Sequence, residues 1–351
     1  MKQAVVKAPG EIIIRDVPRP EIKPDQVLLA VKRIGVCGSD IHVYHGEHPY
    51  TPYPVVQGHE VSGVIVELGE EVNNLQIGDQ ATFTPQIVCG ECYPCRHGRY
   101  HICDNLKVMG FQANGAAQTY FPVDYQKIVK VPASFSLDEA AMIEPLAVAV
   151  HALSRYGDVS GQGVLVLGAG TIGNLVAQAA EAMGAKKVLV TDISSFKLEK
   201  ARECGIANVC NVRKEDLETK IHEGFGEDKT DVIFECVGVQ ETIFQAVQFA
   251  RKGSSIIIVG VFGEVPRVDL GLVQDRELVL MGTLMYQRED YERAVELVGR
   301  GAVNLAPMIT HRYPFDAYPG VYDEIARLEG EVLKVMIAID SNQQINDESH
   351  F

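Results

Sequence analysis

The first third of the chain consists of short apolar runs separated by irregular turns rich in Gly and Pro. No long amphipathic stretch interrupts them, and this pattern is typical of strands that pack one face against a core. Residues 1–146 are therefore predicted to be mostly β, with strands over 11–15, 26–34 and 60–68.

After about residue 146 the pattern changes to apolar runs that alternate with helical stretches. Continuous apolar runs are typical of strands buried on both faces in a parallel sheet. Helices are predicted from the glycines after residue 167 to about 183, and over 197–203 and 241–251. The predicted class is α/β, in which residues 147–285 form a doubly wound parallel sheet. Its strands are expected over 164–167, 188–191, 207–211, 232–236, 255–260 and 278–281.

Residues 286–351 are predicted to return to the first domain. A helical stretch over 289–299 precedes mixed segments and a buried strand over 333–339. The polar end, 341–351, is expected to fray.

Charge and apolar content limit the class of function. The formal net charge is −15 and the sequence pI is near 5.1. Phosphate polymers and anionic membrane surfaces would be repelled, so neither is an expected partner. The sequence has no run of about 18 apolar residues, so a membrane span is not expected. Residues 1–15 lack the pattern of a signal peptide, and we expect a cytoplasmic protein.

One glycine-rich motif predicts a dinucleotide site. It follows an apolar strand and opens a helix, and Asp192 lies 19 residues beyond its last glycine. The glycines permit a tight turn, close approach of a pyrophosphate and close packing of helix on strand. Asp192 would accept hydrogen bonds from ribose hydroxyls and repel a 2′-phosphate, which favours NAD over NADP. The alternative is a glycine turn without a ligand. The motif is Gly168-Ala169-Gly170-Thr171-Ile172-Gly173.

Four of the eight cysteines lie within 15 residues. Their spacing is typical of a closed zinc site, because four thiolates complete a tetrahedron and leave no place for water. Such a site stabilises a lobe, here about 88–104, and does no chemistry. Unrelated thiols and a redox sensor are the alternatives. The four are Cys89, Cys92, Cys95 and Cys103.

Three further residues suggest a second, open metal site. Cys37, His59 and Glu144 could bind Zn²⁺ and leave one position for substrate or water. They are far apart in sequence. Taken singly, each also has an ordinary interpretation as a core thiol, a loop histidine or a charge at a helix start.

Several motifs together carry a family resemblance over essentially the whole chain. In addition to the glycine motif and the cysteine lobe, the chain has Cys37-Gly38-Ser39-Asp40, Gly58-His59-Glu60 and Glu144-Pro145. Together they resemble the zinc-containing medium-chain dehydrogenases, and most closely the sorbitol (polyol) dehydrogenase group. The resemblance implies a GroES-like catalytic domain over 1–146 and 286–351 with an inserted Rossmann domain. It also implies two zinc ions, NAD, an alcohol substrate and a homotetramer or homodimer.

The resemblance also assigns roles. Cys37 and His59 would bind the catalytic zinc, with Glu60 and Glu144 as its carboxylates, either directly or through water. Asp40 would orient the ring of His59. Ser39 would carry the substrate proton onward, and the alcohol dehydrogenase relay would end at His42, for which a plain surface histidine is the alternative.

The substrate is the least determined part. Animal sorbitol dehydrogenases have an arginine where this chain has Met285, before Tyr286, and a tyrosine at Val43. Both departures remove polar groups that would hold polyol hydroxyls. We expect hydride transfer from a secondary alcohol of a polyol or sugar acid to NAD, giving a ketone. Tyr44, Phe111 and Tyr286 either line the pocket or serve only packing.

The sequence also leaves alternative functions. A butanediol or threonine dehydrogenase is the alternative within the enzymes. A zinc-binding regulator or scaffold without catalysis is less consistent with intact candidate ligands. A zinc-free reductase of the same fold is less consistent with the cysteine lobe and Cys37.

Overall fold

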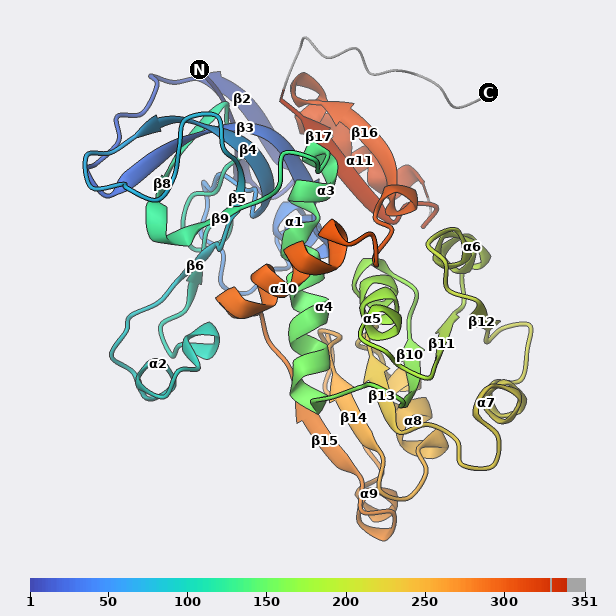
Figure 1. Cartoon of the computed structure of the whole chain (residues 1–351). Coiled ribbons are helices and arrows are strands. Elements are labelled where there is room, and N and C mark those ends of the chain that lie inside the picture. The colour runs from blue at the N-terminus through green and yellow to red at the C-terminus, as the bar shows by residue number, and fades with distance from the viewer. Residues whose placement is uncertain (329, 340–351) are drawn as a thin grey trace.

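The computed structural model describes residues 1–328 and 330–339 (Figure 1). The polar end that is expected to fray lies outside the described residues. Within them, no helix is both long and apolar enough to cross a membrane.

The N-terminal part is built on antiparallel strands, as its apolar pattern predicts. Strands β1 and β2 form a hairpin, and a larger sheet has the order β16-β17-β3-β4-β5-β9, with β8 also paired to β3. Its long central strands bury most of their residues in one core. The bounds are β1 Lys2–Ala8, β2 Glu11–Asp16, β3 Gln26–Val36, β4 Glu60–Leu68, β5 Gln80–Phe83, β8 Tyr120–Asp124, β9 Ile128–Lys130, β16 Ile309–Pro314 and β17 Lys334–Ala338.

The last strands of the chain complete this first sheet. Strand β17 pairs antiparallel with β3, so that Val335 lies opposite Val36. Helix α11 also belongs to this end of the chain (Figure 1). The C-terminal elements are α10 Arg288–Gly299, η3 Ala306–Met308, η4 Phe315–Ala317 and α11 Tyr318–Arg327.

A smaller lobe projects from the sheet (Figure 1). It holds a two-stranded sheet and two short helical turns: β6 Gln86–Ile87, α2 Tyr93–Arg96, η1 Tyr100–Ile102 and β7 Lys107–Val108.

The middle of the chain forms a six-stranded parallel sheet in the order β12-β11-β10-β13-β14-β15. The order reverses between β10 and β13, and sheets of this kind bind ligands at the carboxyl ends of the strands beside that reversal. The strands are β10 Gly163–Leu167, β11 Lys187–Asp192, β12 Asn208–Asn211, β13 Val232–Glu235, β14 Ser255–Ile258 and β15 Val279–Gly282. The helices are α5 Thr171–Ala182, α6 Ser195–Glu203, α7 Leu217–Phe225, α8 Gln240–Phe249 and α9 Leu270–Asp275.

Helix α4, Ile143–Tyr156, lies between the two sheets and packs against α5 and α10 (Figure 1). It runs through the expected domain boundary at 146 without a break. Pro145 stands in its first turn, where the missing N–H costs no helical hydrogen bond. The short helices that precede it are α1 Gly38–His45, η2 Tyr125–Lys127 and α3 Leu137–Ala141.

Candidate active site and dinucleotide site

Strand pairing brings the candidate ligands of the open metal site together. Cys37 directly follows β3, and Glu60 is the first residue of β4. The antiparallel register places Gly35 opposite Glu60, so residues separated in sequence become neighbours. A Cβ at position 35 would lie 2.1 Å from Glu60 Oε2, so the glycine leaves room for this carboxylate.

A three-residue cluster results. The ligand atoms of Cys37, His59 and Glu60 all lie within 4.8 Å of one another. One thiolate, one imidazole and one carboxylate form a donor set that suits zinc with an open position. Glu144 is not a member of that group in the described residues. Its buried carboxylate instead accepts a hydrogen bond from the hydroxyl of Tyr286.

Asp40 lies beside His59, as the resemblance implies. Its Oδ1 is 3.6 Å from His59 Nδ1, and both atoms are buried with no hydrogen-bond partner among the described residues. Asp40 Oδ2 accepts the N–H of Cys37 at 2.9 Å, which fixes the carboxylate at the start of α1. Burial opposes the charged imidazole, yet the carboxylate of Asp40 and the side chain of Cys37 hold the pKa of His59 well above its ordinary value.

Buried carboxylates give the cluster its electrostatic character. Burial raises the pKa of Glu144 to about 7, against the opposing effect of His59. The negative charge of Glu60 is balanced by Lys334, which forms a buried ion pair with it. A divalent cation would offset the remaining negative charge. The unpaired Oδ1 of Asp40 and Nδ1 of His59 could hydrogen-bond to each other when His59 binds a metal through its other ring nitrogen. The residues therefore fit a zinc ion.

Sequence reasoning does not identify two partners of this site. Lys334 lies within a predicted buried strand, and its position as the lone lysine in that apolar run is the available signal. The sequence predicts only a pocket-lining or packing role for Tyr286. In the structure its hydroxyl donates to Glu144, which gives it a polar role.

Ser39 and His42, the two residues of the expected proton relay, lie in the same helix. Ser39 is half-buried in the first turn of α1, and His42 is exposed three positions later on the same helix. That spacing places both side chains on one helical face. His42 Nδ1 lies 3.0 Å from Glu47 Oε2, so its ring is held at the surface.

The structure places two of the suggested pocket aromatics, Tyr44 and Phe111, in different surroundings. The Tyr44 hydroxyl donates to Asp323 at 3.0 Å, and its ring stacks on Tyr322 at 4.9 Å between centroids. That supports the packing interpretation for Tyr44. Phe111 lies against the metal cluster, with its ring centroid 4.9 Å from that of His59.

The four cysteines of the lobe converge. Their Sγ atoms all lie within 4.8 Å of one another, from a loop, α2 and the end of η1. The N–H groups of Glu91 and Cys92 lower the pKa of Cys89 to about 6, which favours the thiolate that a metal requires. All eight cysteines are free of disulfides. Four converging sulfurs fit a closed zinc site.

The glycine motif follows β10, at the point where the strand order of the parallel sheet reverses. Gly168 follows β10 with φ of +103°, and Gly170 caps α5, where an added Cβ would meet nothing within 4 Å. A Cβ at Gly173 would lie 1.9 Å from the carbonyl oxygen of Gly168, so only glycine allows this packing. The open N-terminus of α5 therefore suits a pyrophosphate.

Neighbouring side chains hold this turn in place. Asp192 ends β11, and its carboxylate accepts the N–H groups of Ala169 and Ser194, both at 2.8 Å. Each carboxylate oxygen retains a lone pair for a ribose hydroxyl. The Thr171 hydroxyl donates to the carbonyl of Leu333 at 2.8 Å, which ties the turn to the strand that carries Lys334. Ile172 packs against the core beneath it.

Comparison with known proteins agrees with this architecture. The model of the alcohol dehydrogenase GroES-like domain matches residues 23–133, and that of the zinc-binding dehydrogenases matches residues 171–300. The predicted fold class, a GroES-like domain with a Rossmann-type domain, is thereby confirmed.

Curated relatives cover the chain over most of its length. Sorbitol dehydrogenase of Bacillus subtilis is 30% identical over 96% of this chain and 97% of the relative. The 2-dehydro-3-deoxy-L-galactonate 5-dehydrogenase of Pseudoalteromonas atlantica is 36% identical over 82% of this chain and 84% of the relative.

A solved structure is similar throughout. A protein of Sinorhizobium meliloti 1021, described as a zinc-binding dehydrogenase bound to NADP, superposes with a TM-score of 0.90 at 33% identity. The match covers 96% of this chain and 98% of that one. The resemblance read from the motifs is confirmed: the chain belongs to the zinc-type alcohol and polyol dehydrogenase family of oxidoreductases.

Proposed function

We propose that this protein oxidises a secondary alcohol of a polyol or sugar acid to a ketone and reduces NAD. The observation that carries the proposal is the cluster of half-buried Cys37 with buried His59 and Glu60, which has the donor set of an open zinc site. When bound, zinc supplies Lewis acidity toward the alcohol oxygen, and the dinucleotide accepts the hydride. Relatives that act on sorbitol and on a sugar acid support this substrate class.

The chain's own residues have distinct tasks in this scheme. Cys37, His59 and one of the carboxylates, Glu60 or Glu144, hold the metal. Asp40 orients the imidazole of His59 through their contact at 3.6 Å, which is short enough to tighten when a metal is held. The hydrogen bond from the Tyr286 hydroxyl holds the carboxylate of Glu144 near the site.

The proton leaves along α1. The Ser39 hydroxyl takes the proton of the substrate alcohol and passes it toward His42, one turn away. His42 is exposed and held by Glu47, so it can exchange the proton with solvent. Buried apolar groups, among them the ring of Phe111 beside His59, exclude water from the metal side.

NAD is preferred over NADP in this proposal. Asp192 places a negative charge where the adenosine ribose would lie, and a 2′-phosphate would meet that charge. Cys89, Cys92, Cys95 and Cys103 hold a structural zinc. We further propose a homotetramer or homodimer, which light scattering tests, and a cytoplasmic location, which suits eight free thiols.

The decisive experiment follows NADH absorbance across polyols, aldonates, vicinal diols and threonine, with and without a zinc chelator. Turnover of a polyol or aldonate that the chelator abolishes and added zinc restores is the expected result. Turnover of only a diol or threonine would replace the substrate class and keep the chemistry. A protein that holds zinc and dinucleotide yet turns over no member of the panel would contradict the proposal.

A further inference from the structure

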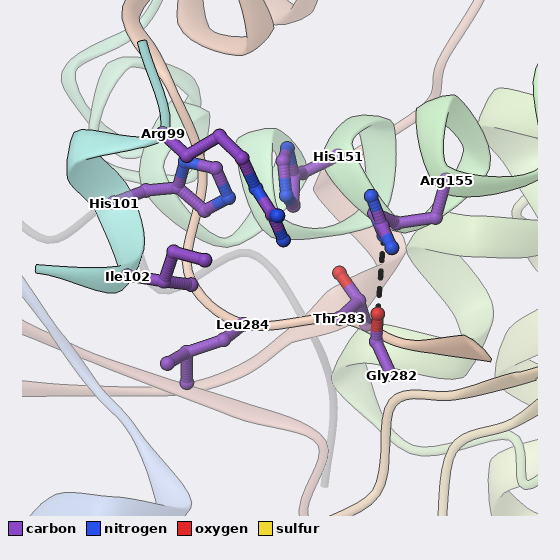
Figure 2. A pocket seen from close by; sticks show the side chains of 8 residues that line it. All are labelled: Arg99, His101, Ile102, His151, Arg155, Gly282, Thr283 and Leu284. Carbon is purple, nitrogen blue, oxygen red and sulfur yellow. Dashed lines mark hydrogen bonds between the residues drawn. The ribbon is translucent and has the colours of Figure 1, made fainter. Parts of the chain in front are cut away.

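A cavity of about 210 Å³ lies where the cysteine lobe approaches the edge of the parallel sheet. Figure 2 shows that its walls come from three segments: the lobe around η1, the second half of α4, and the chain directly after β15. It is separate from the metal cluster and from the glycine motif. The lining residues are Arg99, His101, Ile102, His151, Arg155, Gly282, Thr283 and Leu284.

The cavity concentrates positive charge. Two arginines line it and no carboxylate does. The Arg99 side chain extends toward His151 and Thr283 (Figure 2), and its guanidinium has no hydrogen bond or ion pair to any residue in 1–328 or 330–339. Within residues 1–328 and 330–339, the Arg155 side chain makes one hydrogen bond, from Nε to the carbonyl of Gly282 at 3.1 Å. Most of the N–H donors of the two guanidinium groups are therefore free for a ligand.

Three buried polar atoms of residues that line the cavity have no hydrogen-bond partner in the part of the chain that the structure describes. They are His101 Nδ1, His151 Nε2 and Thr283 Oγ1. The two histidine residues are only 6% and 4% exposed. Unsatisfied buried polar groups destabilise a fold, and such groups indicate a ligand or ion when they gather in one cavity.

One of these histidines is rigidly held. His151 Nδ1 lies 2.8 Å from Asp290 Oδ2, and the two rings of His151 and His101 meet edge to face at 4.6 Å. The carboxylate of Asp290 also accepts the N–H of Gln287 at 2.7 Å, so this acid is engaged away from the cavity. The second ring nitrogen of His151 thus has a fixed direction and no partner.

We propose that this cavity binds an oxyanion of the phosphate class, such as inorganic phosphate or a phosphomonoester. Guanidinium groups match the oxygen pairs of a tetrahedral anion, and charge-assisted hydrogen bonds of this kind are the strong ones. The Thr283 hydroxyl adds a donor, and the histidine nitrogens can pair with the P–OH or P–O groups of a hydrogen phosphate. A cation is excluded by the two arginines.

The bound anion would tie the lobe to both neighbouring segments. Arg99 belongs to the lobe, whereas Arg155 lies on α4 and Thr283 lies three residues before Tyr286. Helix α4 also carries Glu144. Both chain segments that form the Tyr286–Glu144 contact would thus be held by one ligand, so the site is placed to steady the active site from a distance.

The test uses the zinc-loaded protein saturated with dinucleotide, which fills the phosphate-binding turn. Inorganic phosphate is titrated calorimetrically against sodium chloride of equal ionic strength. The wild type should bind one phosphate saturably and gain thermal stability. Arg99→Gln should weaken binding by about tenfold or more, since a charge-assisted pair contributes at least 1.4 kcal/mol.

Two further variants separate binding from structure. Thr283→Val should also weaken binding, yet without phosphate it should be at least as stable as the wild type, because the lost hydroxyl has no partner in the described residues. Arg327→Gln, a change at an arginine whose side chain is 75% exposed on α11, is the matched control and should bind phosphate normally.

Specific results would overturn the proposal. One is a wild type without a saturable response. Another is equal affinity in Arg99→Gln and the wild type. If Arg99→Gln lost zinc from the cysteine lobe while its phosphate affinity stayed the same, Arg99 would serve the thiolates instead, and the anion site would be wrong.

Discussion

Lys334 Nζ lies 2.7 Å from Oε1 and 2.6 Å from Oε2 of Glu60, and both side chains are only 2% exposed. The ammonium also donates to the carbonyl of Val36 at 3.2 Å, beside Cys37. A candidate zinc ligand is therefore also one half of a buried ion pair. Lys334 would compete with a metal for this carboxylate.

Replacing Lys334 should lower the free energy of unfolding, because the buried carboxylate of Glu60 loses its partner. Lys334→Met is expected to destabilise the metal-free protein by about 3–5 kcal/mol, because an uncompensated buried charge remains. The double variant Lys334→Met with Glu60→Gln should recover part of the loss. Urea unfolding measures both. Equal stability of Lys334→Met and the wild type would show that the pair contributes nothing.

The hydrogen bond from Tyr286 to Glu144 should matter for catalysis. Tyr286→Phe removes the donor and keeps the ring, so kcat/KM is expected to fall about 10- to 100-fold with the fold intact. Tyr44→Phe is the matched control, because that hydroxyl bonds Asp323 and not the cluster. Steady-state kinetics with metal analysis provide the measurement. A similar loss in both variants would point to packing rather than to Glu144.

The two metal sites should respond differently to loss of one thiol. Cys37→Ser is expected to abolish turnover and leave the thermal midpoint nearly unchanged, because the open site does not hold a lobe together. Cys95→Ser should mainly lower the midpoint, since a closed site contributes folding energy. Zinc content and thermal unfolding are measured together. Equal thermal losses would contradict the division into catalytic and structural metals.

Cofactor choice should depend on Asp192. Asp192→Ala is expected to lower the ratio of kcat/KM with NAD to kcat/KM with NADP, because it removes the charge that opposes a 2′-phosphate. The substitution also removes acceptors for Ala169 and Ser194. The ratio is the useful measure, since loosening of the turn affects both cofactors. An unchanged ratio would mean that Asp192 only shapes the turn.

Local motifs were predictable from sequence because their parts lie close together in the chain. The cysteine lobe and the glycine motif each occupy a short segment, and their chemistry fixes their spacing. Most of the parallel strands were predictable for the same reason, since they are centred on a continuous apolar run. Helix α11 and strand β16 were not predicted. Their apolar residues are interrupted by charges, and burial against β2 and β17 decides their structure.

The contacts within the open metal site were beyond sequence reasoning alone. Residues were nominated through family resemblance, whereas their partners depend on pairing between distant strands. Lys334 meets Glu60 across 274 positions, and Tyr286 meets Glu144 across 142. No local propensity encodes such a contact, because it follows from the register of β17 on β3 and from the path of the chain after β15.

The pairing of β17 with β3 has a consequence for biosynthesis. The whole parallel sheet, from β10 to β15, leaves the ribosome before Lys334 does, and a domain can fold as soon as it emerges. Glu60 and Cys37 are therefore synthesised well before Lys334. The ammonium group that pairs with Glu60 becomes available only after some 270 further residues have been added. The nascent chain would assemble its cofactor fold before its catalytic cluster, so a truncated product could retain a dinucleotide domain without a finished metal site.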